Sequence, residues 1–399
     1  MTEPAFDRAE YEAREQRVRA RMEQVGLDHL VVGDPAGICY LTGFEGFSFY
    51  VPQAVVVSLA DPLTVIVREI DASSVVATTH LTADQVLGYP ERFVQNPDAH
   101  PMTWAAAQLA ERLHAGQRVG VEVDAAHWTV ASHRALTVAL PAGVEIVETP
   151  AIVAWVRARK SPTEIAMMRE AGRITERMFA TALDAIRPGT HQCDAVADIT
   201  RAQIAGTRTV GGSWSAIPPL VLAGEHTAYP HVPWTDAPFG DDEPIALELS
   251  GAVHRYHAPV ARTMYLGTPP VRLRDLAAVV DDGARAALDV IREGAQCEEV
   301  ARAWNAVIEL HGLTKSSRVG YPIGIGFPPD WGEQTMSLRV GDRTVMEAGM
   351  TFHVMIGMWL DGWGYSTSES VVVTEDGHER LAAVPGGLVG ATKPRSGGK

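Results

Sequence analysis

Two copies of one pattern in the second half of the chain constrain the fold more than any other feature. The segment ALDAIRPGTHQCDAVADITRAQI, beginning at Ala182, resembles ALDVIREGAQCEEVARAWNAVI, beginning at Ala287, apart from one deletion. Each copy predicts a helix-turn-helix unit followed by strands, so two similar halves are expected around one sheet. Cys193 and Cys297 occupy matching positions. We therefore interpret them as core residues of the repeat rather than as nucleophiles.

An alternating pattern of helices and strands precedes the repeat. A helix is predicted over residues 11–25, and the Val/Ile-rich runs LDHLVVGD, AVVVSL and LTVIVREI are typical of strands. Further helices are expected over 102–114 and 128–140, and further strands over 119–123 and 144–147. This order predicts an α/β domain.

A helix start follows this first domain. Ser161, Pro162 and Glu164 match the N-cap, first and third positions of a helix that ends near Pro188. We therefore expect residues 1–155 to form the N-terminal α/β domain. Residues 156–399 then form an α+β domain with a pseudo-twofold repeat and a flexible tail from about residue 386.

Charge and composition exclude several classes of protein. The chain has 34 Lys and Arg against 49 Asp and Glu, a formal net charge of −15, and no basic run, so nucleic acid is not expected as a partner. No apolar run approaches the roughly 20 residues of a membrane span. The polar start MTEPAFDRAEYEAREQ differs from a secretory signal, so we expect a cytoplasmic protein. The three cysteines form no CxxC pair and predict neither disulfides nor a zinc site.

The stretch from Tyr229 to Thr263 concentrates polar residues that a core hairpin does not need. It contains His231, the carboxylate Glu248 within an apolar strand-like run, and a His/Pro/Arg cluster. Glu369 interrupts a later strand in the same way, and a polar group on a buried strand requires a partner. A structural role is sufficient to explain any one of these residues. Together they predict an active site.

An aromatic loop, YLTGFEGFSFYVPQ, lies between the early strands. Its rings are too crowded for one face of a strand, so some must be exposed or packed outside the domain. Two interpretations stay open, a loop that fills its own core or a functional surface. The second interpretation concerns Phe47, Phe49 and Tyr50.

The second domain resembles the creatinase and methionine-aminopeptidase (M24) superfamily, which has the pita-bread fold. The repeat, the hairpin ending in Arg262-Thr263 and the pair Gly349-Met350 carry this resemblance, which also implies a creatinase-type N-terminal domain. Metallopeptidases of the superfamily bind two metal ions through two Asp, one His and two Glu. On this sequence the corresponding positions are Glu248, Pro259, Tyr321, Met355 and Glu369. Proline and methionine are not ligands of hard metals, so we expect neither a metal nor another cofactor.

The resemblance also implies catalytic roles. His231 occupies the place of the proton-shuttling histidine that creatinase keeps without metals. One class of substrate to consider contains an amidinium group, a carbon between two nitrogens that share a positive charge. Hydrolysis of an amidinium requires a counter-ion, an activated nucleophile and a proton for the departing amine. Glu248 and Glu369 fit the first two roles, and His231 fits the third. If the carboxylates lie close together in a dry pocket, at least one pKa should rise. Direct attack by a glutamate and activation of water both remain open.

A closer resemblance is to the ectoine hydrolases of the creatinase branch. It rests on GFEGFSFYVPQ, GYPERFVQNPDAHPM, RVGYPIGIGFPPDWGEQTMSLRVGDRT and GMTFHVMIGMWLDGWG, and it covers nearly the whole chain. Two positions depart from that family's pattern. Ala258 stands where the family has Cys, and Ser366 where it has Glu. Both are expected to face the ligand, so the exact substrate depends on them.

Several residues are predicted to bind substrate. Arg262 either clamps a substrate carboxylate or forms a salt bridge within the sheet, and alternation places His353 on the same face as Met355. Creatinase-like dimers imply a homodimer in which the aromatic loop of one subunit covers the active site of the other and excludes water. The predicted substrate-binding residues are Phe47, Phe49, Tyr50, Tyr229, His257, Arg262, Tyr321 and His353.

Three functions compete at this point. The first is a metal-independent hydrolase that opens the cyclic amidine of ectoine or a close analogue to an N-acetylated diamino acid. The second is a creatinase-like enzyme of the same fold that acts on another amidino or cyclic substrate, a biosynthetic step included. The third is a pseudoenzyme that binds a peptide in an emptied pocket, against which the retention of His231, Glu248 and Glu369 argues.

Overall fold

The computed structural model describes residues 4–390 of the chain. It divides into two compact units, residues 1–157 and 158–399. The boundary predicted from the sequence, after residue 155, lies two residues earlier. None of the helices in the described residues combines the length and apolar character needed to cross a bilayer.

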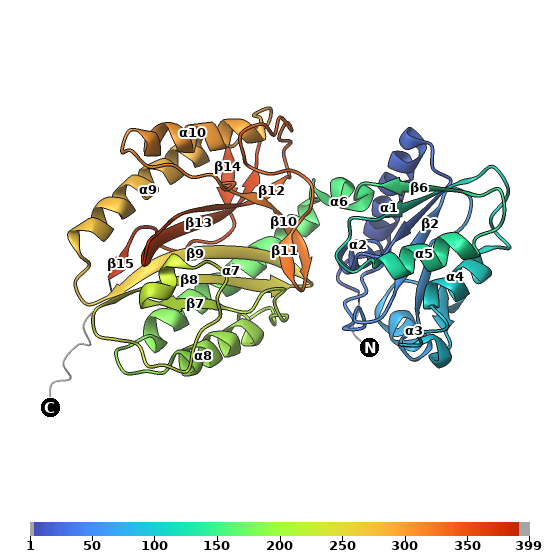
Figure 1. The fold of residues 1–399 in the computed structure, drawn as a ribbon, viewed down its shortest axis with the longest axis horizontal. Coiled ribbons are helices and arrows are strands. Elements are labelled where there is room, and N and C mark those ends of the chain that lie inside the picture. Colours follow the sequence, from blue (N-terminus) through green and yellow to red (C-terminus); the bar gives the residue numbers. More distant parts are fainter. Residues whose placement is uncertain (1–3, 391–399) are drawn as a thin grey trace. The chain divides into compact units, whose positions relative to one another are not determined.

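The first unit is a six-stranded sheet with helices (Figure 1). Its strand order is β4-β3-β2-β1-β5-β6. Core side chains such as Val31 and Val121 are buried because the strands are nearly continuous in Val and Ile. The elements are α1 (Arg8–Val25), β1 (His29–Val32), α2 (Pro35–Thr42), β2 (Ala54–Ser58), β3 (Thr64–Arg68), α3 (Glu69–Thr78), β4 (Val86–Tyr89), α4 (Pro101–Leu109), β5 (Arg118–Glu122), α5 (Val130–Ala139), β6 (Glu145–Thr149) and α6 (Ile152–Arg157).

The predicted strands and helices of this unit are confirmed, but four elements were missed, one of which is α6. Helix α2 starts at an Asp34 side chain that accepts a hydrogen bond from the backbone N–H of Gly37, with proline in its first turn. An N-cap residue such as this one is too weak a signal to predict a helix of eight residues from the sequence. The other two missed elements are α3 and β4.

The second unit is built on a nine-stranded sheet. The main path is β14-β13-β12-β10-β9-β8-β7, with β11 paired to β10 and β15 paired to β9. Its elements are α7 (Pro162–Ala185), α8 (Gln192–Ala205), β7 (Leu220–Ala223), β8 (Glu243–Val253), β9 (Tyr256–Leu266), α9 (Val271–Val290), α10 (Cys297–Glu309), β10 (Tyr321–Phe327), β11 (Asp330–Gly332), β12 (Thr351–Leu360), β13 (Trp363–Val373), β14 (His378–Arg380) and β15 (Val389–Gly390).

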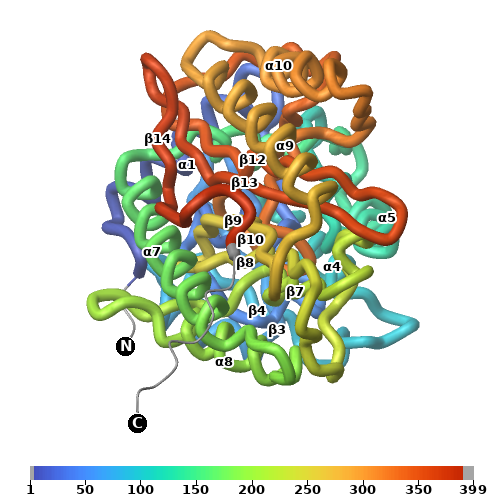
Figure 2. Tube along the Cα trace, turned by 90° about the vertical axis from the view of Figure 1, so that its left-hand side faces the viewer, coloured from blue at the N-terminus to red at the C-terminus, as the bar shows by residue number. Residues whose placement is uncertain are grey.

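The predicted repeat is confirmed by these elements. Each half contributes two helices followed by strands, α7 and α8 in one half and α9 and α10 in the other, and the halves meet where β9 pairs with β10 (Figures 1 and 2). The capping box at Ser161 and Glu164 is also present at the start of α7. Cys297 is buried as expected, but Cys193 is exposed and is therefore not a core residue.

The helices cover one face of the sheet. A side chain added at Gly251 of β8 would meet Ala171 and Ile174 of α7. The Tyr365 hydroxyl of β13 donates a hydrogen bond to Asp281 of α9 at 2.8 Å. Because side chains alternate along each strand, the neighbouring residues on β8 and β13 point to the opposite face, which carries the cavities described below.

A buried arginine holds the hairpin between β8 and β9. His254 and Arg255 have φ of 46° and 67°, as a two-residue hairpin turn requires. The Arg255 guanidinium donates two hydrogen bonds to the Gly326 carbonyl, at 3.1 and 2.6 Å, and lies 3.4 Å from the centre of the Trp214 ring. These contacts fix the hairpin against β10 and so position both strands that border the site.

The predicted flexible tail needs one correction. Residues 389–390 form β15, which pairs in parallel with Met264 and Tyr265 of β9. The remainder of the expected tail, residues 391–399, lies outside the described residues.

Candidate active site

Two adjoining cavities open on the face of the sheet that the helices leave uncovered. Their volumes are about 260 and 550 Å³, within or just below the usual range of small-molecule sites. Residues shared by both linings come from β7, β8 and β10 and from two loops. They are Leu220, His231, Glu248, Arg318 and Tyr321. The structure therefore brings together three predicted site residues that are far apart in sequence.

Glu248 is the central charged group of this site. It lies on β8 opposite Ala261, and 15% of its side chain is exposed. Burial, and then the neighbouring negative charge of Asp330, raise the pKa of Glu248 to about 7. Its Oε1 lies 4.0 Å from Nδ1 of His353. Near neutral pH this carboxyl group is thus able both to accept and to give up a proton.

A chain of hydrogen bonds extends from the cavity into the sheet. The Tyr321 hydroxyl accepts a hydrogen bond from Nε1 of Trp331 at 3.0 Å and lies 2.9 Å from Nδ1 of His353. Nε2 of His353 lies 2.6 Å from Oγ of Ser368, which accepts a hydrogen bond from the Ala261 backbone N–H.

The tautomer of His353 decides the direction of the tyrosine hydrogen. Burial lowers the pKa of His353 to about 3, so the ring is neutral. With hydrogen on Nδ1, Ser368 donates to Nε2 and His353 donates to Tyr321. The Tyr321 hydroxyl then accepts two hydrogen bonds and can direct its own hydrogen into the cavity. Tyr321 therefore lines both cavities and His353 lies behind it, while their contact with substrate stays a prediction.

His231 lies at the mouth of both cavities. It is exposed and has a positive φ of 69°, which is uncommon for a residue with a side chain. Tyr229, two residues earlier, is 49% exposed and is absent from the described linings of both cavities. The structure thus supports a site position for His231 but gives no contact with the site for Tyr229.

Glu369 does not share the site with Glu248, and the expectation that these two carboxylates lie together is wrong. In the β12–β13 pairing, Met355 is opposite Ser368, and Glu369 is opposite Val354. Since a shift of one residue reverses the face of a strand, Ser368 points toward His353 and Glu369 points to the helix-covered face. Glu369 lines a separate cavity there, together with Asp281.

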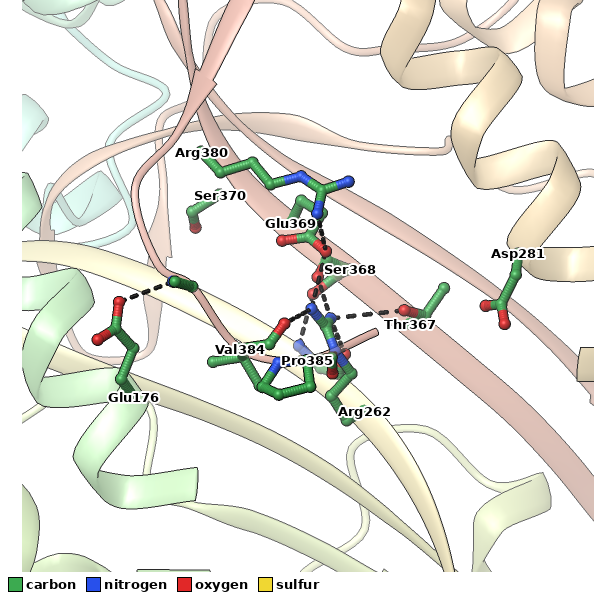
Figure 3. Close-up of polar contacts among 12 residues, drawn as sticks. Glu176, Arg262, Asp281, Thr367, Ser368, Glu369, Ser370, Arg380, Val384 and Pro385 are labelled. Atoms are coloured by element: carbon green, nitrogen blue, oxygen red, sulfur yellow. Dashed lines mark hydrogen bonds and ion pairs between the residues drawn. The ribbon is translucent and has the colours of Figure 1, made fainter. Parts of the chain in front are cut away.

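Arg262 lies on that same face (Figure 3). Its guanidinium forms an ion pair with Glu369 at 2.7 Å and donates hydrogen bonds to the carbonyls of Ser368, Val384 and Pro385. Of the two roles considered for Arg262, the structure supports the salt bridge within the sheet. These contacts lie away from the Glu248 cavities, so the structure gives no support to a substrate clamp at those cavities.

His257 and Ala258 also differ from expectation. His257 is fully buried; its Nε2 accepts from the Ala216 N–H at 3.0 Å, and its Nδ1 is 2.7 Å from the Arg255 carbonyl. Both ring nitrogens are thus engaged by the backbone, and burial lowers the pKa of His257 to about 3. Ala258 is paired with Gly251 and so faces α7 rather than the ligand. Ser366, by contrast, lines the smaller cavity as predicted.

Sequence reasoning missed three charged residues at the cavities. Asp330, on β11, lines the larger cavity and supplies the second carboxylate near Glu248. Lys315 and Arg318, in the loop after α10, line the smaller cavity. The string around Asp330 is visible in the sequence as PPDWGE, but nothing in the sequence places the Lys315 loop beside β12.

The aromatic loop belongs to the first unit. Phe47 and Tyr50 are 63% and 60% exposed, whereas Phe49 packs against Phe47 and His127. The Tyr50 hydroxyl accepts a hydrogen bond from Arg68. The loop therefore presents large apolar surface instead of filling its own core, and its contact with substrate stays a prediction.

The residues present do not fit a dinuclear metal centre. Met355 lines the cavity at one expected ligand position, Tyr321 occupies another, and Glu369 is on the wrong face. Within residues 4–390, no group of three or more His, Cys, Asp or Glu side chains is arranged to hold a metal ion.

Comparison with known proteins defines the class of this fold and site. Residues 14–159 match the Creatinase/Prolidase N-terminal domain, and residues 166–375 match Metallopeptidase family M24. The chain therefore belongs to the M24 family, with a creatinase-type N-terminal domain and a pita-bread second domain. The dipeptidase PepE structure from Mycobacterium ulcerans has the same fold, with a TM-score of 0.79, 23% identity, and coverage of 97% of this chain and 99% of that one.

Particular relatives are more similar in sequence. The chain is 39% identical to the ectoine hydrolase of Halomonas elongata, covering 95% of this chain and 97% of that protein. It is 42% identical to the uncharacterized hydrolase/peptidase y4tM of Sinorhizobium fredii, covering 96% of this chain and 98% of the relative. Creatinase of a Bacillus species is 26% identical, covering 96% of this chain and 93% of the creatinase. The protein is thus a hydrolase of the M24 creatinase/peptidase family.

Proposed function

We propose that this protein is a metal-independent hydrolase that opens the C–N bond of a cyclic amidine, with ectoine as its first substrate. The observation that carries the proposal is Glu248, a carboxyl group whose pKa is raised to about 7 inside a cavity that also exposes His231 and Tyr321. A small cationic ligand fits this arrangement because the carboxylate neutralises it in a poorly hydrated space. The 39% identity to an ectoine hydrolase over nearly the whole chain supports the same substrate class.

The site residues supply the groups that amidine hydrolysis needs. The amidinium carbon lies between two nitrogens and takes up a nucleophile while one C–N bond breaks. Glu248 provides the electron pair, either by attacking the carbon or by taking a proton from water that attacks it. His231 gives a proton to the departing ring nitrogen. The product is an open chain in which one amine is free and the other carries an acyl group.

The remaining polar groups position the reacting atoms. The Tyr321 hydroxyl, held by Trp331 and His353, can donate to the oxygen that adds to the amidine carbon. Asp330 adds negative charge near Glu248 and so favours binding of the cationic ring. The arrangement has a second carboxylate, as amidinium recognition needs, although it comes from β11 and not from β13.

The test is direct incubation of the purified protein with ectoine and creatine. Mass spectrometry should show a product of ectoine with the mass of one added water, and none from the Glu248→Gln variant. Turnover should survive a chelator, and elemental analysis should find no stoichiometric metal. Absence of an ectoine product would contradict the proposed substrate. Activity that is lost in chelator and restored by zinc or manganese would contradict metal independence.

A further inference from the structure

The smaller cavity has a positively charged end that the reaction described above does not use. Lys315 lines this cavity together with Glu248. Its Nζ donates a hydrogen bond to the Gly357 carbonyl at 3.0 Å and lies 4.3 Å from the centre of the Trp359 ring. The ammonium group therefore has a fixed position at the cavity wall, with hydrogens to spare because one of its three is used.

Neither cation of this region has an anionic partner. Within the described residues, no carboxylate forms an ion pair with Lys315 or with Arg318. Arg318 instead lies 4.4 Å from the Tyr321 ring centre. The whole chain has 49 acidic and only 34 basic residues, so carboxylates are in excess. Lys315, which has no carboxylate partner among the described residues, is therefore available to a negatively charged ligand.

Strand β12 connects this end of the cavity with the catalytic end. His353, which adjoins Glu248, and Gly357, which holds Lys315, are four residues apart, about 14 Å along a strand. Met355 lies between them, and Ser366 on β13 faces Gly357; both line the cavity. Lys315 supplies a cation at the Gly357 end, and Glu248 supplies a carboxyl group at the His353 end.

We infer that Lys315 forms a subsite for a carboxylate of the substrate. This inference rests on the proposed function and narrows its substrate class to zwitterions in which a cyclic amidinium and a carboxylate belong to one small molecule. Lys315 acts on binding and not on bond cleavage, because it contacts the end of the cavity away from Glu248. The structure thus assigns specificity to a loop lysine in addition to the sheet residues.

The proposal competes with a structural role, in which Lys315 only covers Trp359 and caps the Gly357 carbonyl. To separate the two roles, the Lys315→Met variant and the wild type are assayed with two substrates. One is ectoine, and the other is 2-methyl-1,4,5,6-tetrahydropyrimidine, which is the same ring without the carboxylate. A charged hydrogen bond contributes about 1.5–3 kcal/mol. We therefore expect KM for ectoine to rise about 10- to 150-fold, kcat to change little, and KM for the carboxylate-free ring to stay unchanged. Lys315→Arg should restore part of the ectoine affinity.

Arg272 provides a matched control. Its guanidinium lies 4.9 Å from the centre of the Trp363 ring, and it is absent from the described linings of both cavities. Arg272→Met removes a cation from a tryptophan and should alter neither KM. Equal changes for the two substrates in Lys315→Met, or no change for either, would overturn the inference.

Failure of the proposed function would give a different result. If the wild-type protein converts neither ring, the hydrolase proposal is wrong, and the subsite is then tested by calorimetric titration with propionate and ectoine as binding probes. Binding that weakens at least tenfold in Lys315→Met supports the carboxylate subsite on its own. Equal binding to wild type and Lys315→Met, or no binding to either, refutes it.

Discussion

Glu369 and Arg262 form an ion pair of 2.7 Å, between Oε1 and Nη2, on the face of the sheet turned away from the Glu248 cavities. Arg262 also binds the carbonyls of Val384 and Pro385, so the pair attaches the C-terminal segment to β9 and β13. Burial raises the pKa of Glu369, while Arg262 and Arg380 oppose that rise. This contact has the character of a structural clamp rather than of catalytic machinery.

Substitution of Glu369 should therefore affect stability more than chemistry. Glu369→Gln keeps the shape but removes the charge that Arg262 faces, and loss of a charged hydrogen bond costs about 1–3 kcal/mol. Urea unfolding should show this loss, while kcat of the folded variant stays within a few-fold of wild type. Glu248→Gln is the matched substitution in the cavity and should abolish turnover. A Glu369→Gln protein that is stable but inactive would show that our assignment of the two carboxylates is wrong.

Activity should depend on the protonation of Glu248. Its pKa is raised to about 7, and the titratable and charged groups around it are Asp330, Arg318, His231, Tyr321 and His353. Because Glu248 acts as a carboxylate, kcat/KM should rise with pH and level off above about 7. Steady-state rates between pH 5 and 9 measure this limb. Asp330→Asn removes a negative neighbour and should shift the rise of kcat/KM to lower pH. An unchanged pH profile would mean that Asp330 does not raise the pKa of Glu248.

The same pKa predicts a stability effect with a definite sign. Between the unfolded value near 4.5 and the folded value of about 7, the folded protein binds more protons at Glu248 than the unfolded chain does. Stability from this group is therefore present below about pH 4.5 and lost as pH rises through 7. Glu248→Gln should thus be more stable than wild type at pH 8, by on the order of 1–3 kcal/mol. Denaturant unfolding at pH 5 and pH 8 measures this effect. The difference in free energy of unfolding between Glu248→Gln and the wild type should be smaller at pH 5 than at pH 8.

Tyr321 should act through its hydroxyl. In Tyr321→Phe the Trp331 N–H and the His353 ring lose their shared partner, and the cavity loses a donor. Removal of one such donor typically lowers kcat by about 10²–10³-fold. Stopped-flow or steady-state assays with ectoine measure kcat and KM separately. Ser368→Ala, which touches His353 from the other side, should give a smaller loss; equal losses would mean that the whole hydrogen-bonded chain only maintains the fold.

The exposed aromatic loop offers a test of the expected homodimer. Phe47 and Tyr50 are more than half exposed and lie close together in one loop. If they cover the active site of a second subunit, Phe47→Ala and Glu248→Gln each inactivate a homodimer. Mixing the two variants after mild dissociation should then restore up to about a quarter of wild-type activity, because mixed dimers contain one complete site. A mixture without activity would contradict a shared site.

Local sequence signals were enough for much of the fold. The capping box at Ser161 and Glu164 depends on residues three apart, and the repeat beginning at Ala182 and Ala287 shows two related halves without any tertiary information. Glu248 was found because a carboxylate interrupts an apolar strand, and His231 because the family resemblance assigns a histidine to that position. The sequence also shows that Pro259 and Met355 stand where metallopeptidases of the family have metal ligands, and neither side chain binds a hard metal ion.

Tertiary structure decided which charges face one another. The register of β12 with β13 places Ser368 at His353 and sends Glu369 to Arg262, and one residue of register reverses every side chain on a strand. The second carboxylate at the cavity, Asp330, becomes a neighbour of Glu248 only through packing between distant segments. The amino-acid sequence by itself therefore determined the family, the two-domain plan and half of the site. Pairing and packing between distant strands determined the other half, since no local pattern encodes which face of a fully buried strand meets the ligand.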